Sequence, residues 1–149
     1  GTGVQGDELT NKAAVVAQAI TVNKDTMTDP LQVLRCVGGL ELAAIVGAVL
    51  AARLARVPVM LDGYACTASA AILHAIDPAL LDHFQVGPLS AEPSHQSLCT
   101  NIGKVPLLAM GMRLGEGSGA TLAANIVRAA IRCHTGMATF AEAGVSDKD

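Results

Sequence analysis

Apolar residues recur along the chain in two spacings, one typical of amphipathic helices and one typical of short buried strands. Residues 7–23 carry apolar side chains at intervals of three or four, which predicts an amphipathic helix. Its stripe consists of Leu9, Ala13, Val16 and Ile20. Residues 39–56 are apolar on nearly every side of a helix, so we expect that helix to be buried on most faces. The short run VPVMLDGY at 57–64 predicts a buried parallel strand that ends at Asp62.

Two Asp-Pro pairs, at 29–30 and 77–78, place a capping carboxylate before a proline at the first helical position. The first pair predicts a short helix over 31–37 that ends at two glycines, and the second predicts a helical start over 77–84. Residues 66–76 also have helical spacing.

A second strand is predicted over 105–119, and it runs into the turn LGEGSGA and a helix over 121–132. Helices that alternate with short apolar strands are typical of an α/β fold with an open, mostly parallel sheet. Ligands of such sheets bind beyond the carboxyl ends of the strands. We therefore expect DGYACT at 62–67 and GEGSGA at 115–120 to meet at a ligand site.

The composition indicates one domain with a core of small aliphatic side chains. The chain has 149 residues, of which 51% are hydrophobic and 2% aromatic. A net charge of −3 and scattered basic residues argue against a nucleic-acid surface. Cys36, Cys66, Cys99 and Cys133 lack the spacing of a zinc site and are expected to be free thiols. The sequence has neither a signal peptide nor a run long enough to span a bilayer, so we expect a soluble cytoplasmic protein.

The glycines of LGEGSGA precede a helix, whose N-terminal N–H groups and partial positive charge suit a small anion such as phosphate. The Ser118 hydroxyl would add another donor. The turn also fits GxGxxA, a weak match to a dinucleotide fingerprint. However, no acidic residue lies about twenty positions further on, and Glu116 would repel a pyrophosphate. A single phosphate fits better, and a turn without any ligand is the alternative.

Glu142 lies among Ala and Phe residues in ATFAEAGVS. Apolar surroundings raise the pKa of a carboxyl group, as a general base near neutral pH requires, although an exposed helical residue is the alternative. Lys12 reads either as a solvated charge or as a phosphate contact. Glu41 and Asp62 are expected to be caps or turn formers. The four histidines lack metal-like spacing, so each is expected to be a surface or hydrogen-bonded core residue, and no metal is predicted.

Five blocks in order resemble one family, nicotinate-nucleotide:5,6-dimethylbenzimidazole phosphoribosyltransferase, over essentially the whole chain. The blocks are LQVLRCVGGLELAAIVGAVLAA, VPVMLDGY, SAEPSHQ, MRLGEGSGA and MATFAEAGVS. The resemblance implies a Rossmann-like, three-layer α/β fold in which residues 1–149 form the C-terminal portion of the family's domain and the N-terminal half is absent. It also implies transfer of ribose 5-phosphate from nicotinate mononucleotide to 5,6-dimethylbenzimidazole, which gives α-ribazole 5′-phosphate and nicotinate. A homodimer or a complementary N-terminal chain would be the partner.

By match of motif, the resemblance implies Glu142 as general base and Phe140 as a contact of the benzimidazole. Lys12 and the backbone and hydroxyl of residues 117–119 would hold the phosphate, that is Gly117, Ser118 and Gly119. No cofactor is implied, because the leaving nicotinate is already a pyridinium and the donor carries only a monophosphate. The alternatives are an inactive or partner-dependent nucleotide-binding fragment of that enzyme and, on GxGxxA alone, a small dinucleotide-binding protein.

Overall fold

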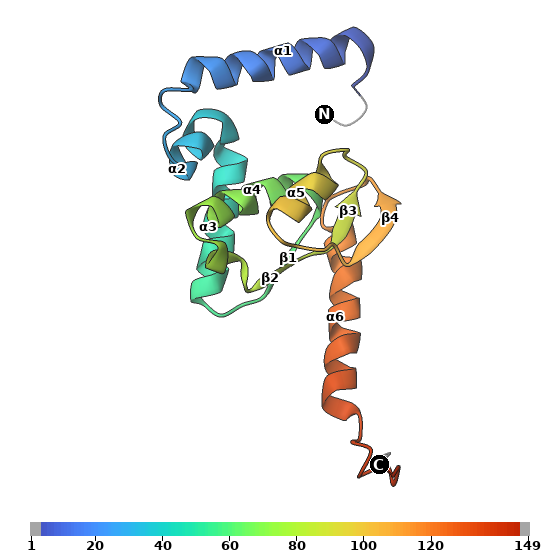
Figure 1. The fold of residues 1–149 in the computed structure, drawn as a ribbon. Coiled ribbons are helices and arrows are strands. Elements are labelled where there is room, and N and C mark those ends of the chain that lie inside the picture. Colours follow the sequence, from blue (N-terminus) through green and yellow to red (C-terminus); the bar gives the residue numbers. More distant parts are fainter. Residues whose placement is uncertain (1–3, 147–149) are drawn as a thin grey trace.

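The computed structural model describes residues 4–146, in which helices surround a few short parallel strands (Figure 1). The α-helices are α1 (Gly6–Asn23), α2 (Pro30–Val33), α3 (Leu40–Leu54), α4 (Gly63–Ile76), α5 (His95–Asn101) and α6 (Ser118–Gly136). The short helical turns are η1 (Leu34–Gly38), which is π-helical, and η2 (Pro78–Leu81), which is 3-10 helical. The strands are β1 (Val59–Leu61), β2 (Phe84–Val86), β3 (Pro88–Ser90) and β4 (Leu108–Met112).

The four strands form two parallel pairs, which continue into one another because β2 and β3 are separated only by Gly87. β1 pairs in parallel with β2, and β3 pairs in parallel with β4. At the junction, the Gly87 N–H donates to the Leu61 carbonyl over 2.9 Å, while the Gly87 carbonyl accepts from the Leu108 N–H over 3.0 Å. Residues 84–90 therefore lie between β1 and β4 and join them. The predicted α/β class with parallel strands is confirmed.

The middle segment of this sheet was not predicted from the sequence. The helical start expected over 77–84 extends only through η2, and the chain is already a strand at Phe84. Phe84 and Val86 are buried and Gln85 is exposed, but an alternation of three residues is too short to distinguish from a helix edge. The seven-residue helix α5 was also missed. The strand expected over 105–119 is confined to β4.

The buried core lies between α3, α4 and the β1–β2 pair, and α5 closes it. Its largest fully buried apolar side chains are Phe84, Leu73 and Val86. α3 contributes only Val46 and Val49 as buried residues, so the expectation that this helix is buried on most faces is wrong in this chain. Its remaining apolar surface lacks a covering element among the residues described.

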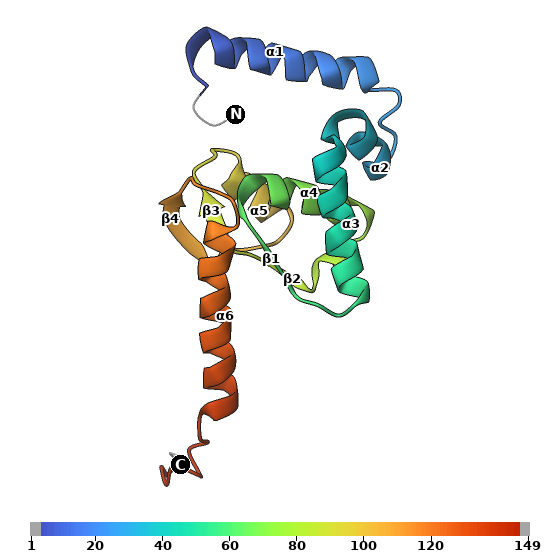
Figure 2. The same ribbon diagram turned by 180° about the vertical axis from the view of Figure 1, so that it is seen from behind.

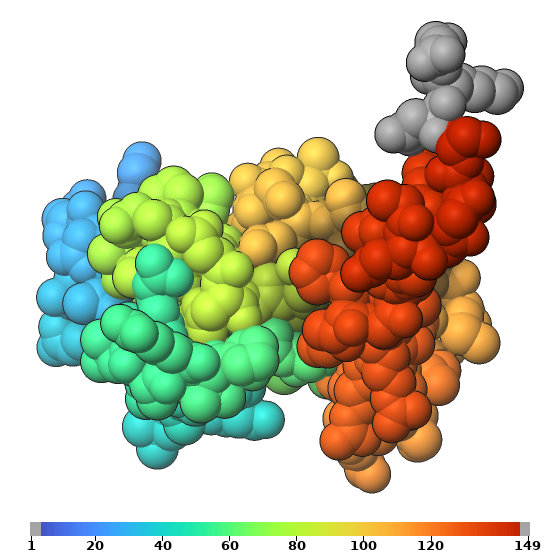
Figure 3. Space-filling view, turned by 90° about the horizontal axis from the view of Figure 1, so that it is seen from below, coloured from blue at the N-terminus to red at the C-terminus, as the bar shows by residue number. Residues whose placement is uncertain are grey.

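α1 and the end of α6 lie at opposite ends of the molecule (Figures 1 and 2). α1 is a helix as predicted but buries none of its residues, and Leu9, Val16 and Ile20 are each about half exposed, at 53%, 51% and 49%. α6 extends away from the sheet, and the view from below shows its outer side chains uncovered (Figure 3). None of the helices between residues 4 and 146 has the length and hydrophobicity that a membrane span requires.

Candidate functional site

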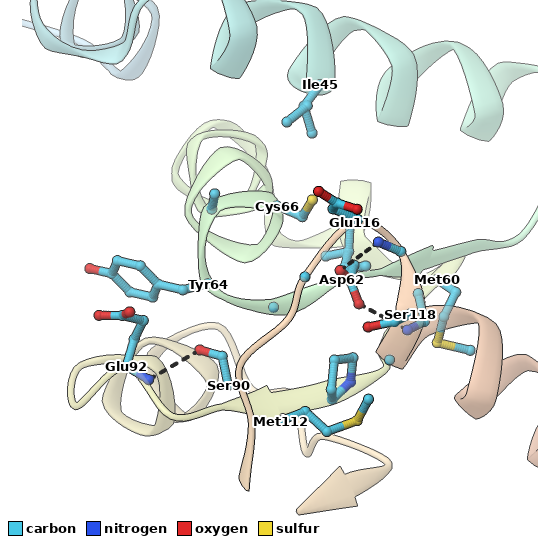
Figure 4. A pocket seen from close by; sticks show the side chains of 18 of the residues that line it. Ile45, Met60, Asp62, Tyr64, Cys66, Ser90, Glu92, Met112, Glu116 and Ser118 are labelled. Atoms are coloured by element: carbon cyan, nitrogen blue, oxygen red, sulfur yellow. Dashed lines mark hydrogen bonds between the residues drawn. The ribbon is translucent and has the colours of Figure 1, made fainter. Parts of the chain in front are cut away.

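A cavity of about 940 Å³ opens beyond the carboxyl ends of the strands, and its volume suits a small-molecule site. The polar and sulfur-containing side chains that line it include Asp62, Ser90, Glu92, Met112, Glu116 and Ser118 (Figure 4). These residues come from the ends of β1, β3 and β4, from the loop before α6 and from the first residue of α6. The predicted meeting of 62–67 with 115–120 is therefore confirmed.

The loop before α6 is built from three consecutive residues in the left-handed region. Gly115, Glu116 and Gly117 have φ angles of +75°, +56° and +78°. Glycine adopts this region without strain, whereas a residue with a side chain loses on the order of 1–2 kcal/mol there. Glu116 is thus held in an unfavourable backbone conformation at the edge of the cavity, a combination that is common at functional sites.

Gly119 serves a different purpose, because it allows the start of α6 to touch the sheet. A Cβ atom at this position would overlap the ring of Pro88, with the Pro88 Cβ only 2.6 Å away. A Cβ at Gly87 would come within 3.0 Å of the Ala120 Cα. The first turn of α6 therefore packs directly on the strand that joins β1 to β4.

The N-terminus of α6 already holds a carboxylate, that of Asp62 at the end of β1. Asp62 Oδ2 accepts a hydrogen bond from the Gly117 N–H over 2.9 Å, and Oδ1 accepts one from the Ala120 N–H over 2.9 Å (Figure 4). An internal carboxylate thus occupies the positive helix end to which the sequence pattern assigned a phosphate. Asp62 is the cap that was expected, but it caps a helix more than fifty residues further along.

The Asp62 cap leaves fewer hydrogen-bond donors at the start of α6 that could bind a phosphate. The Ser118 N–H donates to the Gly115 carbonyl over 3.0 Å, and the Thr121 N–H to the Gly117 carbonyl over 2.8 Å. Of the N–H groups of 117–121, only that of Gly119 has no acceptor within residues 4–146. The Ser118 hydroxyl is also buried without a partner there. The Gly117 N–H is already bound to Asp62, so Ser118 and Gly119 are the residues of the turn that keep donors without acceptors among residues 4–146.

Charged side chains of both signs surround the cavity. Lys12 of α1 and Arg113 after β4 are the basic residues of its lining, and Glu41 of α3 lies there with Glu92 and Glu116. Lys12 and Ser118, two of the predicted phosphate contacts, therefore line the same cavity. A bound anion would be stabilised near either of these basic groups.

A buried histidine fixes the other edge of the cavity. The His95 Nδ1 accepts a hydrogen bond from the Ser90 N–H over 2.9 Å. Its proton therefore lies on Nε2, which is 3.0 Å from the Thr67 hydroxyl. Burial lowers the pKa of His95, which favours the neutral ring. The prediction that this histidine is a hydrogen-bonded core residue is confirmed, and it ties the end of β3 to α4.

Glu142 and Phe140 lie outside the cavity, in a turn after α6. The Glu142 carboxylate accepts hydrogen bonds from the Thr139 N–H over 2.8 Å and from the Thr139 hydroxyl over 2.9 Å. These bonds lower the pKa of Glu142. The alternative of an exposed residue therefore holds for Glu142, and the apolar surroundings and raised pKa required of a general base are wrong because its partner is polar. Phe140 is 69% exposed, so it does not lie against a base-binding pocket within this chain.

The turn of Glu142 and the loop of Glu116 each have a local sequence signal that could have predicted them. Thr139 and Glu142 have the T-x-x-E spacing of a capping box, and the Glu142 N–H indeed donates to the Thr139 hydroxyl over 3.2 Å. Glu116 was considered only as an obstacle to pyrophosphate, although it lies inside the glycine loop. No local pattern links Asp62 to α6, since the contact depends on the pairing of distant strands.

Parallel strands joined through helices, with a cavity beyond their carboxyl ends and a glycine-rich turn at a helix start, define an α/β domain with a candidate small-molecule site. A family model described as "Phosphoribosyltransferase" matches residues 1–145. The chain belongs to this phosphoribosyltransferase family.

Similar proteins narrow the resemblance further. The nicotinate-nucleotide–dimethylbenzimidazole phosphoribosyltransferase of Rhizobium meliloti (strain 1021) is 56% identical over 149 residues, which is 100% of this chain and 44% of that protein. The protein of the same name from Sinorhizobium medicae (strain WSM419) is 57% identical over 148 residues, with 99% and 44% covered. The crystal structure of CobT from Thermus thermophilus superimposes with a TM-score of 0.91 at 43% identity, over 99% of this chain and 44% of that one. The chain thus spans less than half the length of the relatives that it matches.

Proposed function

We propose that this chain forms part of the active site of an enzyme that transfers ribose 5-phosphate from nicotinate mononucleotide to 5,6-dimethylbenzimidazole. The products would be α-ribazole 5′-phosphate, which supplies the lower-ligand nucleotide of cobalamin, and nicotinate. The observation that carries the proposal is the glycine loop of 115–119, which brings to one cavity a carboxylate and a hydroxyl without a partner among residues 4–146. The names of relatives that are 56–57% identical over the chain support the choice of substrates.

The reaction needs one proton acceptor and a firm hold on the nucleotide. The unprotonated ring nitrogen of the benzimidazole attacks C1′ of the ribose as the bond from C1′ to the nicotinate nitrogen breaks. The nicotinate ring takes that electron pair and loses its positive charge, so it needs no proton. The new benzimidazolium must then lose the proton of its other nitrogen to a base, which contributes most when it is held in place.

Glu116 is the carboxylate that we assign as this base. It lines the cavity that also contains Ser118 and Lys12, and its backbone is held in the left-handed region. Glu142, the base implied by the motif match, lies beyond the end of α6. That helix has 19 residues and is therefore roughly 28 Å long. Glu142 would serve only if its turn entered the cavity of another chain.

The phosphate is assigned to the side of the cavity nearest the start of α6. The Ser118 hydroxyl and the Gly119 N–H are donors without partners among residues 4–146, and Lys12 brings a positive charge to the same cavity. Hydrogen bonds to a charged phosphate are worth about 1.5–3 kcal/mol each. We expect the first two groups to bind a monophosphate and Lys12 to add favourable charge, while the Asp62 carboxylate disfavours a larger anion at the helix end.

A second candidate is a nucleotide-binding module that needs a partner for activity. It is favoured by the apolar stripe of α1, which remains about half exposed. Either a second copy or a complementary N-terminal chain would cover such a stripe. Light scattering separates the two, because only the first doubles the mass of the isolated chain.

The test is to incubate the chain with nicotinate mononucleotide and 5,6-dimethylbenzimidazole and to search for α-ribazole 5′-phosphate by mass spectrometry. A parallel reaction adds the unmatched part of the Rhizobium meliloti relative. Product in the first reaction supports an active chain, whereas product only in the second supports the partner-dependent module. Absence of product and of nucleotide binding in both would overturn the proposal.

A further inference from the structure

We infer that Asp62 is a positioning residue, which holds loop 115–117 in the conformation that places Glu116 and Ser118 on the cavity. The consequence of this positioning for catalysis rests on the proposed function. The carboxylate bridges two segments that are far apart in the chain, because it accepts from the N–H groups of Gly117 and Ala120, each over 2.9 Å.

Both carboxylate oxygens are used, one on each side of Ser118 and Gly119. The Gly117 N–H belongs to the residue that precedes α6, and the Ala120 N–H belongs to its first turn. Gly117 has no side chain to cap the helix that follows it, so Asp62 performs from another strand the role that an N-cap side chain usually performs. The bonds thus fix the direction in which the loop enters the helix.

The loop needs such a fixed point because its conformation is unfavourable for Glu116, whose φ is +56°. The Glu116 side chain makes no hydrogen bond or salt bridge to any other residue between 4 and 146. Its place at the cavity is therefore set by the backbone on either side of it. On the C-terminal side, Asp62 holds that backbone directly.

The backbone of Asp62 is fixed by strand pairing, so its carboxylate can fix the position of loop 115–117. It follows Leu61, which is buried and paired with Val86 in the β1–β2 ladder. The Leu61 carbonyl also accepts from the Gly87 N–H over 2.9 Å. The Asp62 carboxylate therefore extends from the paired end of a strand. It holds the loop in a fixed position relative to the sheet.

The experiment measures amide hydrogen exchange by NMR in the wild-type chain, Asp62→Asn and Asp62→Ala. We expect the Gly117 and Ala120 amides to exchange roughly tenfold faster or more in Asp62→Ala, and to a smaller extent in Asp62→Asn, which keeps one acceptor oxygen. The Leu73 amide in the core of α4 reports global unfolding and should exchange as in the wild type. Asp62→Asn serves as the test if Asp62→Ala does not fold.

Asp29→Asn is the matched control, because Asp29 also accepts from two backbone N–H groups over 2.9 Å, those of Leu31 and Gln32. It is the local cap of α2 and does not line the cavity. Its loss should accelerate exchange in α2 alone and leave the Gly117 and Ala120 amides unchanged. A comparable acceleration at those two amides in Asp29→Asn would overturn the inference.

Turnover completes the test, measured with the unmatched part of the Rhizobium meliloti relative added and at a temperature at which every variant is folded. We expect kcat to fall at least tenfold in Asp62→Ala, less in Asp62→Asn, and not at all in Asp29→Asn. Wild-type exchange at Gly117 and Ala120, or wild-type kcat despite faster exchange, contradicts the inference. If no form makes product, the proposed function fails, while exchange still decides whether Asp62 holds the loop.

Discussion

Two turns of this molecule each present a glutamate, and they are held in opposite ways. Glu116 lies in a left-handed loop whose following N–H groups bind Asp62, and the contacts span 55 and 58 residues of sequence. Glu142 lies in a capping box closed by Thr139, three residues away. The first turn depends on the whole sheet for its shape, whereas the second depends only on its own residues.

This difference indicates which carboxylate is better placed to accept a proton from a bound substrate. A capping-box carboxylate is already committed to donors within its own turn, and those donors lower the pKa of Glu142 and oppose proton uptake. The Glu116 side chain has no such commitment among residues 4–146 and lines a cavity of about 940 Å³. Local apolar neighbours in the sequence favoured Glu142, but in the fold it is Glu116 that lines the cavity.

The largest expected effect separates the two glutamates directly. Glu116→Gln should reduce kcat by roughly a hundredfold or more, the usual contribution of a general base, while Glu142→Gln should change it by less than about twofold. Both variants preserve size and remove only the charge. The measurement is steady-state formation of α-ribazole 5′-phosphate with the unmatched part of the Rhizobium meliloti relative present.

The opposite ranking would transfer the role of base to Glu142 and would require its turn to enter the cavity of a second chain. Mixing Glu116→Gln with Glu142→Gln then provides a decisive control. Restored turnover in the mixture would show that the two glutamates act in different copies of one shared site.

The sequence predicts this molecule well where a feature is local. Helix α1, the Asp29 cap of α2 and the strand ending at Asp62 all follow from spacings within about twenty residues. The junction of two motifs at the cavity was also predictable, because carboxyl ends of parallel strands share one edge. Local spacings of this kind are enough to define the fold class.

Prediction stops where a contact joins distant segments. The strand at 84–90 is recognisable only through its partners on both sides, since each half contains just three residues. The bonds of Asp62 to α6 and of His95 to Thr67 likewise have no periodic signature. Sequence reasoning therefore could not show that Asp62 takes two of the N–H groups at the helix end to which it assigned the phosphate.

The second largest effect concerns the contact that fixes the cavity loop to the sheet. Gly119→Ala should destabilise the fold by about 1–3 kcal/mol, because the new methyl group overlaps Pro88 in a packed region. Urea denaturation monitored by circular dichroism provides the measurement.

Gly47→Ala in α3 is the matched control for Gly119→Ala, since an added Cβ there meets nothing within 4 Å. It should stabilise the protein by about 0.5–1 kcal/mol, as expected for alanine in a helix interior. A neutral result for Gly119→Ala would mean that α6 can shift away from Pro88, and the cavity loop would then be less constrained than its contacts indicate.

A smaller effect should appear as pH dependence of stability through His95, the buried residue that binds the N–H of Ser90 at the edge of the cavity. Burial lowers its pKa from the usual value of 6.5, so the folded state binds this proton less readily than the unfolded state. Above about pH 6.5 both states hold a neutral ring, and stability should not depend on this group. Below that pH the unfolded state gains the proton first, and the free energy of unfolding should fall.

The decrease in the free energy of unfolding is limited to about 1.4 kcal/mol per pH unit for a single titrating group. Urea denaturation at pH 7.5, 6.5 and 5.5 measures it, with His95→Gln as the variant that cannot titrate. His95→Gln should be less stable at pH 7.5, because the Ser90 N–H and the Thr67 hydroxyl lose well-placed partners. Between pH 6.5 and 5.5 it should lose less stability than the wild type. Equal losses in both proteins would contradict a neutral, buried His95.

The smallest expected effect belongs to the C-terminal turn, and it completes the comparison. Thr139→Ala removes the hydroxyl that accepts from the Glu142 N–H and that donates to the Glu142 carboxylate. The pKa of Glu142 should rise towards its usual value, because one of the bonds that lowers it is lost. Side-chain NMR titration of Glu142 measures that change.

The urea midpoint and kcat should stay as in the wild type, since this turn contributes no buried residue. A loss of turnover in Thr139→Ala would connect the two turns functionally and would contradict their independence.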